Sequence, residues 1–110
     1  MIEEIVLRHL NSTLDVPVSL ERVSTNPPFV ILEKTSSSRN NHITTSTFAI
    51  QSYGKSMYKA AELNEAVKAA MDALIEVDGI SASMLNSDYN YTDTTKKQYR
   101  YQCVYDIVHE

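Results

Sequence analysis

The sequence is poor in the residues that many small-molecule enzymes depend on: it has one cysteine, two glycines and no tryptophan. Both a dinucleotide-binding fingerprint and a phosphate-binding P-loop need several closely spaced glycines, so Gly54 and Gly79 cannot build either motif. The lone Cys103 cannot form an internal disulfide, which fits a reducing compartment and leaves stability to the hydrophobic core. The composition therefore excludes nucleotide chemistry by these two routes and predicts an intracellular type of protein.

Long hydrophobic runs and basic clusters are also missing. No stretch approaches the ~20 apolar residues needed to span a bilayer, and the acidic N-terminus, Met1 to Ile5, lacks the basic leader of a secretory signal. Ten Lys and Arg stand against fourteen Asp and Glu, giving a net charge of −4, and the longest basic cluster is Lys96-Lys97. Nucleic-acid binders that track phosphates need a concentrated basic face, so we expect a protein that stays in the cell and does not bind DNA specifically.

The chain of 110 residues has the length of one domain, residues 1–110. Apolar spacing predicts helices over residues 2–11 and from Ser56 to Asp78, whereas period-two alternation and β-branched runs predict strands elsewhere. Polar residues 35–41 have no apolar anchor and are predicted to be a mobile surface loop. The expected strands are residues 16–21, 29–35, 42–53, 80–91 and 99–108, with connections at Thr25-Asn26-Pro27-Pro28 and at residues 92–95.

These elements follow the order α-β-β-β-α-β-β. Amphipathic helices beside half-buried strands pack as two layers around one core. The fold class predicted is therefore α+β: a single two-layer domain, with a mixed or antiparallel sheet of about five strands and two helices on one face.

Catalytic and metal-binding patterns are weak. The histidines His9, His42 and His109 lie on separate elements, so a zinc site would require them to converge with a carboxylate or Cys103. Cys103 lies in the middle of a strand, where a free cysteine usually behaves as a small buried hydrophobe. Asp88 and Asp93 fit no calcium loop, and turn polarity explains them. We therefore expect no enzyme, no metal and no cofactor.

Tyrosine is the most informative residue type, because five of the seven tyrosines fall in the final hairpin. A tyrosine offers a large contact area, a polar tip and few rotatable bonds, which suits a protein interface. Alternatively, these side chains only cover the second side of the sheet. The five are Tyr89, Tyr91, Tyr99, Tyr101 and Tyr105.

A family resemblance rests on segments spread over nearly the whole chain: Asp15-Val16-Pro17-Val18, Pro28 to Glu33, Phe48 to Tyr53, Ala60 to Glu65, Leu85 to Tyr91 and Tyr99 to Gln102. Together they resemble small proteins of the head and tail module of long-tailed bacteriophages of Gram-positive hosts. In size and element order the chain is most similar to the tail terminator family, also called tail completion or tail-to-head joining proteins.

This resemblance implies a structural protein that forms hexameric rings, caps the tail tube, stops its polymerisation and offers a surface for joining the head. The implied partners are other copies of the chain, the tail tube protein and a head connector protein, and the implied location is the head-tail junction of the virion after synthesis in the host cytoplasm. DNA would pass through the ring without specific binding, which suits the negative charge. A head-completion or connector adaptor is the alternative in the same particle.

Two groups of residues are the candidate interface. The polar loop is predicted to reach a neighbouring molecule and the tyrosine hairpin to supply a second patch, because a closed ring joins two different patches. A third hypothesis, a small ligand-binding domain, would use His42, Asp88 and the tyrosines around a pocket. The candidate interface residues are Arg39, Asn40, Asn41, His42, Tyr89, Tyr91, Tyr99 and Tyr101.

Overall fold

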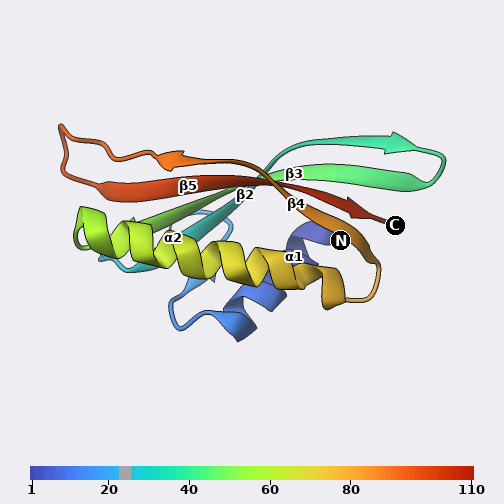
Figure 1. Ribbon diagram of the computed structural model, residues 1–110, viewed down its shortest axis with the longest axis horizontal. Coiled ribbons are helices and arrows are strands. Elements are labelled where there is room, and N and C mark those ends of the chain that lie inside the picture. The colour runs from blue at the N-terminus through green and yellow to red at the C-terminus, as the bar shows by residue number, and fades with distance from the viewer. Residues whose placement is uncertain (23–25) are drawn as a thin grey trace.

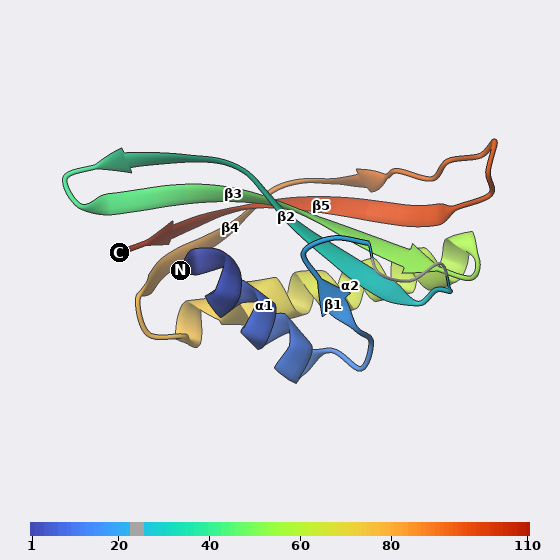
Figure 2. The same ribbon diagram turned by 180° about the vertical axis from the view of Figure 1, so that it is seen from behind.

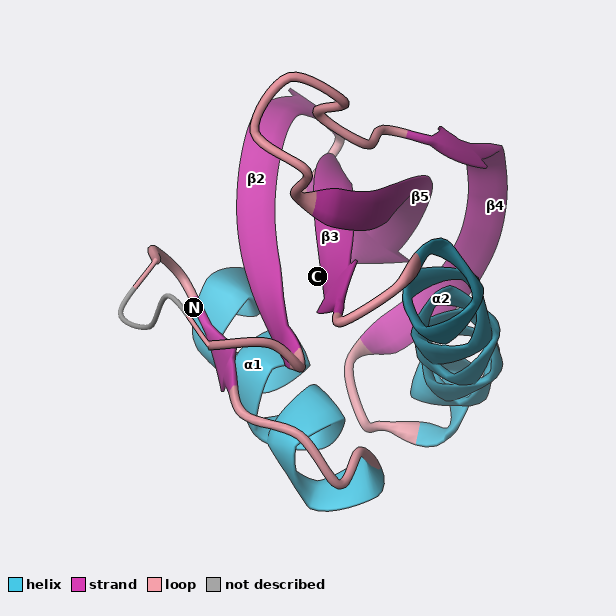
Figure 3. Ribbon diagram, turned by 90° about the vertical axis from the view of Figure 1, so that its left-hand side faces the viewer, coloured by secondary structure: helices cyan, strands magenta, loops and turns pink. Residues whose placement is uncertain are grey.

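The computed structural model describes residues 1–22 and 26–110, and within them the predicted α+β class is confirmed. One five-stranded sheet has the order β1-β2-β3-β5-β4, with β1 parallel to β2 and the other neighbours antiparallel. Both helices pack against the same face of this sheet (Figure 3). The elements are α1 (Ile2–Thr13), β1 (Val18–Ser19), β2 (Phe29–Asn40), β3 (Ile43–Gly54), α2 (Met57–Asp72), the 3-10 helix η1 (Ala73–Glu76), β4 (Ile80–Asn90) and β5 (Tyr99–His109).

The core lies between the helices and the sheet. Helix α1 buries Ile2, Val6 and Leu10, which recur at a four-residue spacing and so fall on one helical face. Helix α2 begins at Ser56, whose side chain accepts a hydrogen bond from the backbone N–H of Lys59 at 3.1 Å and caps the first turn. Alternate residues of the central strands meet the two helices, including the fully buried Leu32, Phe48, Ile50, Tyr105 and Ile107.

The predicted surface loop at residues 35–41 is wrong, because these residues continue strand β2. Ser36 to Asn40 pair with Ile43 to Thr47 in an antiparallel hairpin, which we call the hairpin arm (residues 36–47). Its two-residue turn has positive φ at Asn41 (52°) and His42 (70°), as the tightest hairpin turns require. Serine and threonine side chains face each other across the arm. Backbone hydrogen bonds between the two strands, and not burial of apolar side chains, therefore stabilise the arm.

Strand β1 is shorter than the predicted residues 16–21. Only Val18 and Ser19 pair with β2, opposite Val30 and Ile31. Pro17 has no N–H to donate, although its carbonyl accepts from the N–H of Val30 at 2.9 Å. Of the predicted connection after this strand, Thr25 lies outside the described residues.

Strands β4 and β5 form the predicted final hairpin, which is irregular along its outer strand. The register shifts between Ile80 and Ala82 and again between Leu85 and Ser87, so β4 carries two bulges. The connection spans residues 91–98 and is longer than the predicted turn, with an isolated bridge between Asp93 and Gln98.

The molecule is elongated, with extents of 45 × 24 × 22 Å. The hairpin arm projects at one end, where the η1–β4 connection and both chain ends also lie, and the β4–β5 connection and the start of α2 lie at the other (Figures 1 and 2). Within the described ranges, no helix is long and apolar enough to cross a membrane.

Candidate protein interface

The sheet face that points away from the helices carries a stacked aromatic pair. The rings of Phe29 and Tyr53 lie 4.5 Å apart between centroids and 17° from parallel, on neighbouring strands β2 and β3. The guanidinium of Arg22 lies 5.6 Å from the Phe29 centroid and 5.4 Å from that of Tyr53. Cation–π attraction therefore holds the Arg22 side chain against these rings.

A row of amide side chains continues across this face. Gln51 donates through Nε2 to Oε1 of Gln102 at 2.9 Å, and Gln102 donates through its own Nε2 to the hydroxyl of Tyr89. The hydroxyl of Tyr53 donates to Oε1 of Gln51 at 3.3 Å. The row ties strands β3, β5 and β4 together and fixes the orientation of both tyrosines.

Arg100 joins the row to the end of the hairpin. It donates to the backbone carbonyl of Tyr91 at 2.6 Å and to the Tyr53 hydroxyl at 3.1 Å, while its guanidinium lies 4.4 Å from the Tyr91 ring centroid. Tyr91 meets the Tyr89 ring edge to face at 6.1 Å, and both remain exposed, at 42% and 41%. We call Arg22, Tyr53, Tyr89, Tyr91 and Arg100 the aromatic patch.

The aromatic patch has the chemistry of a protein contact surface. Tyrosine and arginine are enriched at the energetic centres of interfaces. Here their side chains are already fixed by hydrogen bonds and stacking, so little rotamer entropy remains to be lost on binding. No described helix covers this face of the sheet (Figure 3).

The predicted tyrosines divide between the two faces of the sheet. Tyr89 and Tyr91 belong to the aromatic patch, whereas Tyr99 and Tyr101 pair with Gly54 and Ser52 on the side of the helices and are half-buried. Tyr105 is buried there, and its hydroxyl donates to the Asp72 carboxylate at 2.8 Å. Burial and this carboxylate raise the pKa of Tyr105, so the ring belongs to the core.

The other candidate residues lie at the opposite end of the molecule. Arg39 and Asn40 end strand β2, Asn41 and His42 form the turn of the hairpin arm, and all four are exposed. The predicted interface residues therefore form two separate groups (Figure 1). Sequence reasoning missed Arg22, Tyr53 and Arg100, because stacking across strands depends on a register that spacing alone does not reveal.

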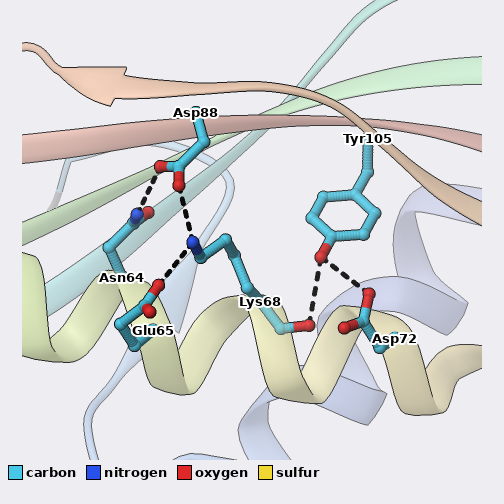
Figure 4. Close-up of polar contacts among 6 residues, drawn as sticks. All are labelled: Asn64, Glu65, Lys68, Asp72, Asp88 and Tyr105. Carbon is cyan, nitrogen blue, oxygen red and sulfur yellow. Dashed lines mark hydrogen bonds and ion pairs between the residues drawn. The ribbon is translucent and has the colours of Figure 1, made fainter.

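Asp88 has a structural role that corrects its interpretation as turn polarity. It lies within β4, accepts from Asn64 Nδ2 at 2.6 Å and from Lys68 Nζ at 2.6 Å, and so joins β4 to α2 (Figure 4). Lys68 also pairs with Glu65. The hydrogen bonds to Asp88 and then to Glu65 raise the pKa of Lys68, which therefore stays charged. Asp93 is a turn residue as expected: its Oδ1 accepts from the N–H groups of Thr95 and Lys96.

The residues of the ligand-binding hypothesis do not meet. His42 is in the arm turn, whereas Asp88 lies beneath α2. A hollow of about 530 Å³ between the end of α1 and the first half of α2 is lined by neither of them; Leu14, Val16 and Leu63 supply apolar walls.

The remaining reactive side chains are held in separate places. His9 Nε2 lies 2.7 Å from the carbonyl of Ala70, and His109 Nε2 lies 2.8 Å from the hydroxyl of Ser46. Across residues 1–22 and 26–110, no three His, Cys, Asp or Glu side chains gather as metal ligands. Cys103 is fully buried, and desolvation raises its pKa to about 12, so its thiol stays protonated near neutral pH.

Comparison of the chain with protein-family models found no family that matches, and comparison with curated proteins found no match either.

Proposed function

We propose that this chain is a structural subunit of a long-tailed bacteriophage, a tail terminator that assembles as a ring of about six copies on the end of the tail tube. The observation that carries the proposal is the aromatic patch on the helix-free face of the sheet. Its fixed tyrosines and arginines suit contact with another protein surface. The resemblance of the chain to tail terminators suggests that the surfaces contacted belong to other copies of the chain and to the tail tube.

The placement of the two candidate groups supports a closed ring. In a ring each copy meets its two neighbours through different surfaces, so one molecule must carry two unlike patches. The aromatic patch extends to the end of the β4–β5 hairpin, and the hairpin arm projects at the other end of the 45 Å axis. A small-molecule site would instead need groups that converge on one hollow.

The charge of the chain supports passage of DNA through such a ring. Each copy carries −4, so a ring multiplies a field that repels phosphate. We propose the tail tube protein and a head connector protein as partners, the head-tail junction as the location, no cofactor and no enzymatic activity.

The test is termination of tube growth. The purified chain, added to polymerising tail tube protein, should shorten the tubes and appear at one end of each by immuno-labelling. Tubes of unchanged length with no bound label would refute the proposal. Label confined to the portal side of the joint would instead indicate the head-completion adaptor.

Two variants distinguish specific binding through the aromatic patch from non-specific hydrophobic association. Tyr89→Ser combined with Tyr91→Ser should abolish capping and leave the chain folded, because both rings are about 40% exposed. The melting temperature should fall modestly, because the contacts of these rings with Gln102 and Arg100 are lost. Leu85→Ser is the matched control: it removes a side chain of similar exposure (48%) from the same strand, opposite Tyr105 and so on the other face of the sheet. Equal loss of capping in both variants would count against the patch.

A further inference from the structure

Opposite charges gather at the two ends of the long axis. One end carries the start of α2, where Tyr58 is 73% exposed, and the β4–β5 connection, where Lys96 and Lys97 are exposed (Figure 1). We call these three residues and the exposed Lys55 the basic end. Gly54 pairs with Tyr99, which brings the end of β3 near the β4–β5 connection, and Lys55 after it lines the hollow between α1 and α2 with Asp15 and Glu62. Asp93 is the one carboxylate in that connection.

The other end carries the opposite sign. Glu76 ends η1 and Asp78 lies in the η1–β4 connection. The N–H of Glu110 donates to the carbonyl of Gly79 at 3.2 Å, which brings the backbone of this third acidic residue beside them. Ile75 is exposed there at 48%; we call Ile75, Glu76, Asp78 and Glu110 the acidic end. Arg8 lines a hollow with Asp78 and offsets part of the charge.

Among the described residues, none of the three lysines of the basic end and none of the three carboxylates of the acidic end forms an ion pair. Tyr58 and Ile75 stand at opposite ends of α2 and η1, about 25 Å apart at the helical rise. One molecule therefore cannot bring its own two ends together.

We propose that the basic end of one copy docks against the acidic end of a second copy of this chain. The two ends match in chemistry, because each end carries one exposed apolar side chain, Tyr58 or Ile75, and exposed charges of one prevailing sign. Interfaces commonly have such an apolar centre with a charged rim. The contact joins two unlike patches, so it closes into a ring or continues as a chain of copies. This inference rests on the proposed function, since it adds a charged contact to the meeting of neighbouring ring subunits, beside the aromatic patch at one end and the hairpin arm at the other.

The experiment is a charge swap on the full chain, with association measured by sedimentation at low ionic strength. Lys96→Glu with Lys97→Glu, or Glu76→Lys with Asp78→Lys, should each weaken self-association at least about tenfold, because like charges then face each other. The chain that carries all four substitutions has the wild-type net charge of −4 and complementary ends again. It should therefore regain association, as should an equal mixture of the two double variants.

Each other outcome overturns the inference. Unchanged association of either double variant, or no recovery in the four-fold variant, would show that copies meet elsewhere while leaving ring formation by the wild type intact. Variants that associate normally but fail only on tail tubes would assign the charged ends to the tube protein. A wild-type chain that stays monomeric both alone and with tubes would refute the inference and the proposed ring together.

Discussion

Gly54 is the position where adding a single methyl group should do the most damage. A Cβ there would lie 2.4 Å from the backbone nitrogen of Ala60, and 2.8 Å from both the Cα of Ala60 and the carbonyl carbon of Lys59. These atoms belong to the first turns of α2, where Ala60 is fully buried, so no flexible side chain can move aside. Gly54→Ala must therefore push the start of the helix off the sheet.

The expected cost is about 3 kcal/mol, the upper part of the range for overpacking a buried contact. For a chain of 110 residues this corresponds to a fall in Tm of about 12–15 °C. Thermal unfolding followed by circular dichroism, with urea titration at one temperature, measures both values. Adding Ala60→Gly should not restore stability, because the obstructing atoms are backbone.

Gly79→Ala is the matched control, because it should destabilise the chain through backbone strain and not through a steric clash. Gly79 has φ of +91° and an added Cβ would meet nothing within 4 Å, so only backbone strain of about 1–2 kcal/mol is expected. If Gly54→Ala melts within ~2 °C of the wild type, the close approach of α2 to the end of β3 is wrong. Rescue by Ala60→Gly would refute the backbone clash as the cause.

Three further perturbations test the core and its polar links. Val67→Asp buries an unpaired charge at a fully buried position and should cost about 3 kcal/mol or more, whereas Ala69→Asp on the exposed side should cost little, by urea unfolding. Folding raises the pKa of the Cys103 thiol to about 12, above its value of about 8.5 in the unfolded chain. The contribution of this thiol to the free energy of unfolding is therefore complete below about pH 8.5 and is lost as the pH rises. Stability should therefore fall by up to about 1.4 kcal/mol per pH unit between roughly pH 9 and 10, and the same slope in Cys103→Val would contradict this. A double-mutant cycle of Asp88→Ala and Lys68→Ala should give a coupling of about 1 kcal/mol, reduced by salt because both side chains keep contact with solvent; zero coupling would contradict the link between β4 and α2.

The apolar periodicity of the chain was sufficient to predict most of the fold. The apolar stripe of α2 is confirmed, and so is the alternation in β5, which buries Cys103, Tyr105 and Ile107. Both were predictable because buried positions of a helix or strand are apolar at the period of that element. The second half of the hairpin arm lies in the predicted strand 42–53, but the first half was predicted as a loop because residues 36–40 are polar and exposed. The only local signal of the arm was Asn41 before His42, at a turn that needs two positive φ values.

The candidate interface was only partly predictable, for a geometric reason. Alternation places Tyr99 and Tyr101 on one face of β5, but the face of Tyr89 depends on how β4 aligns with β5. A bulge between Leu85 and Ser87 helps to set that alignment and places Tyr89 opposite Gln102, away from the helices. The stack of Arg22 on Phe29 and Tyr53 joins segments on different strands, and no spacing rule indicates it.

The two bulges of β4 have a consequence for the free chain. An unpaired strand at the margin of a sheet can template endless addition of further strands, which leads to fibres. Each bulge breaks the even succession of hydrogen-bonding groups, between Ile80 and Ala82 and between Leu85 and Ser87, so an incoming strand finds no long regular ladder to copy. The bulges thus protect this margin of the sheet against uncontrolled strand addition when the chain is concentrated.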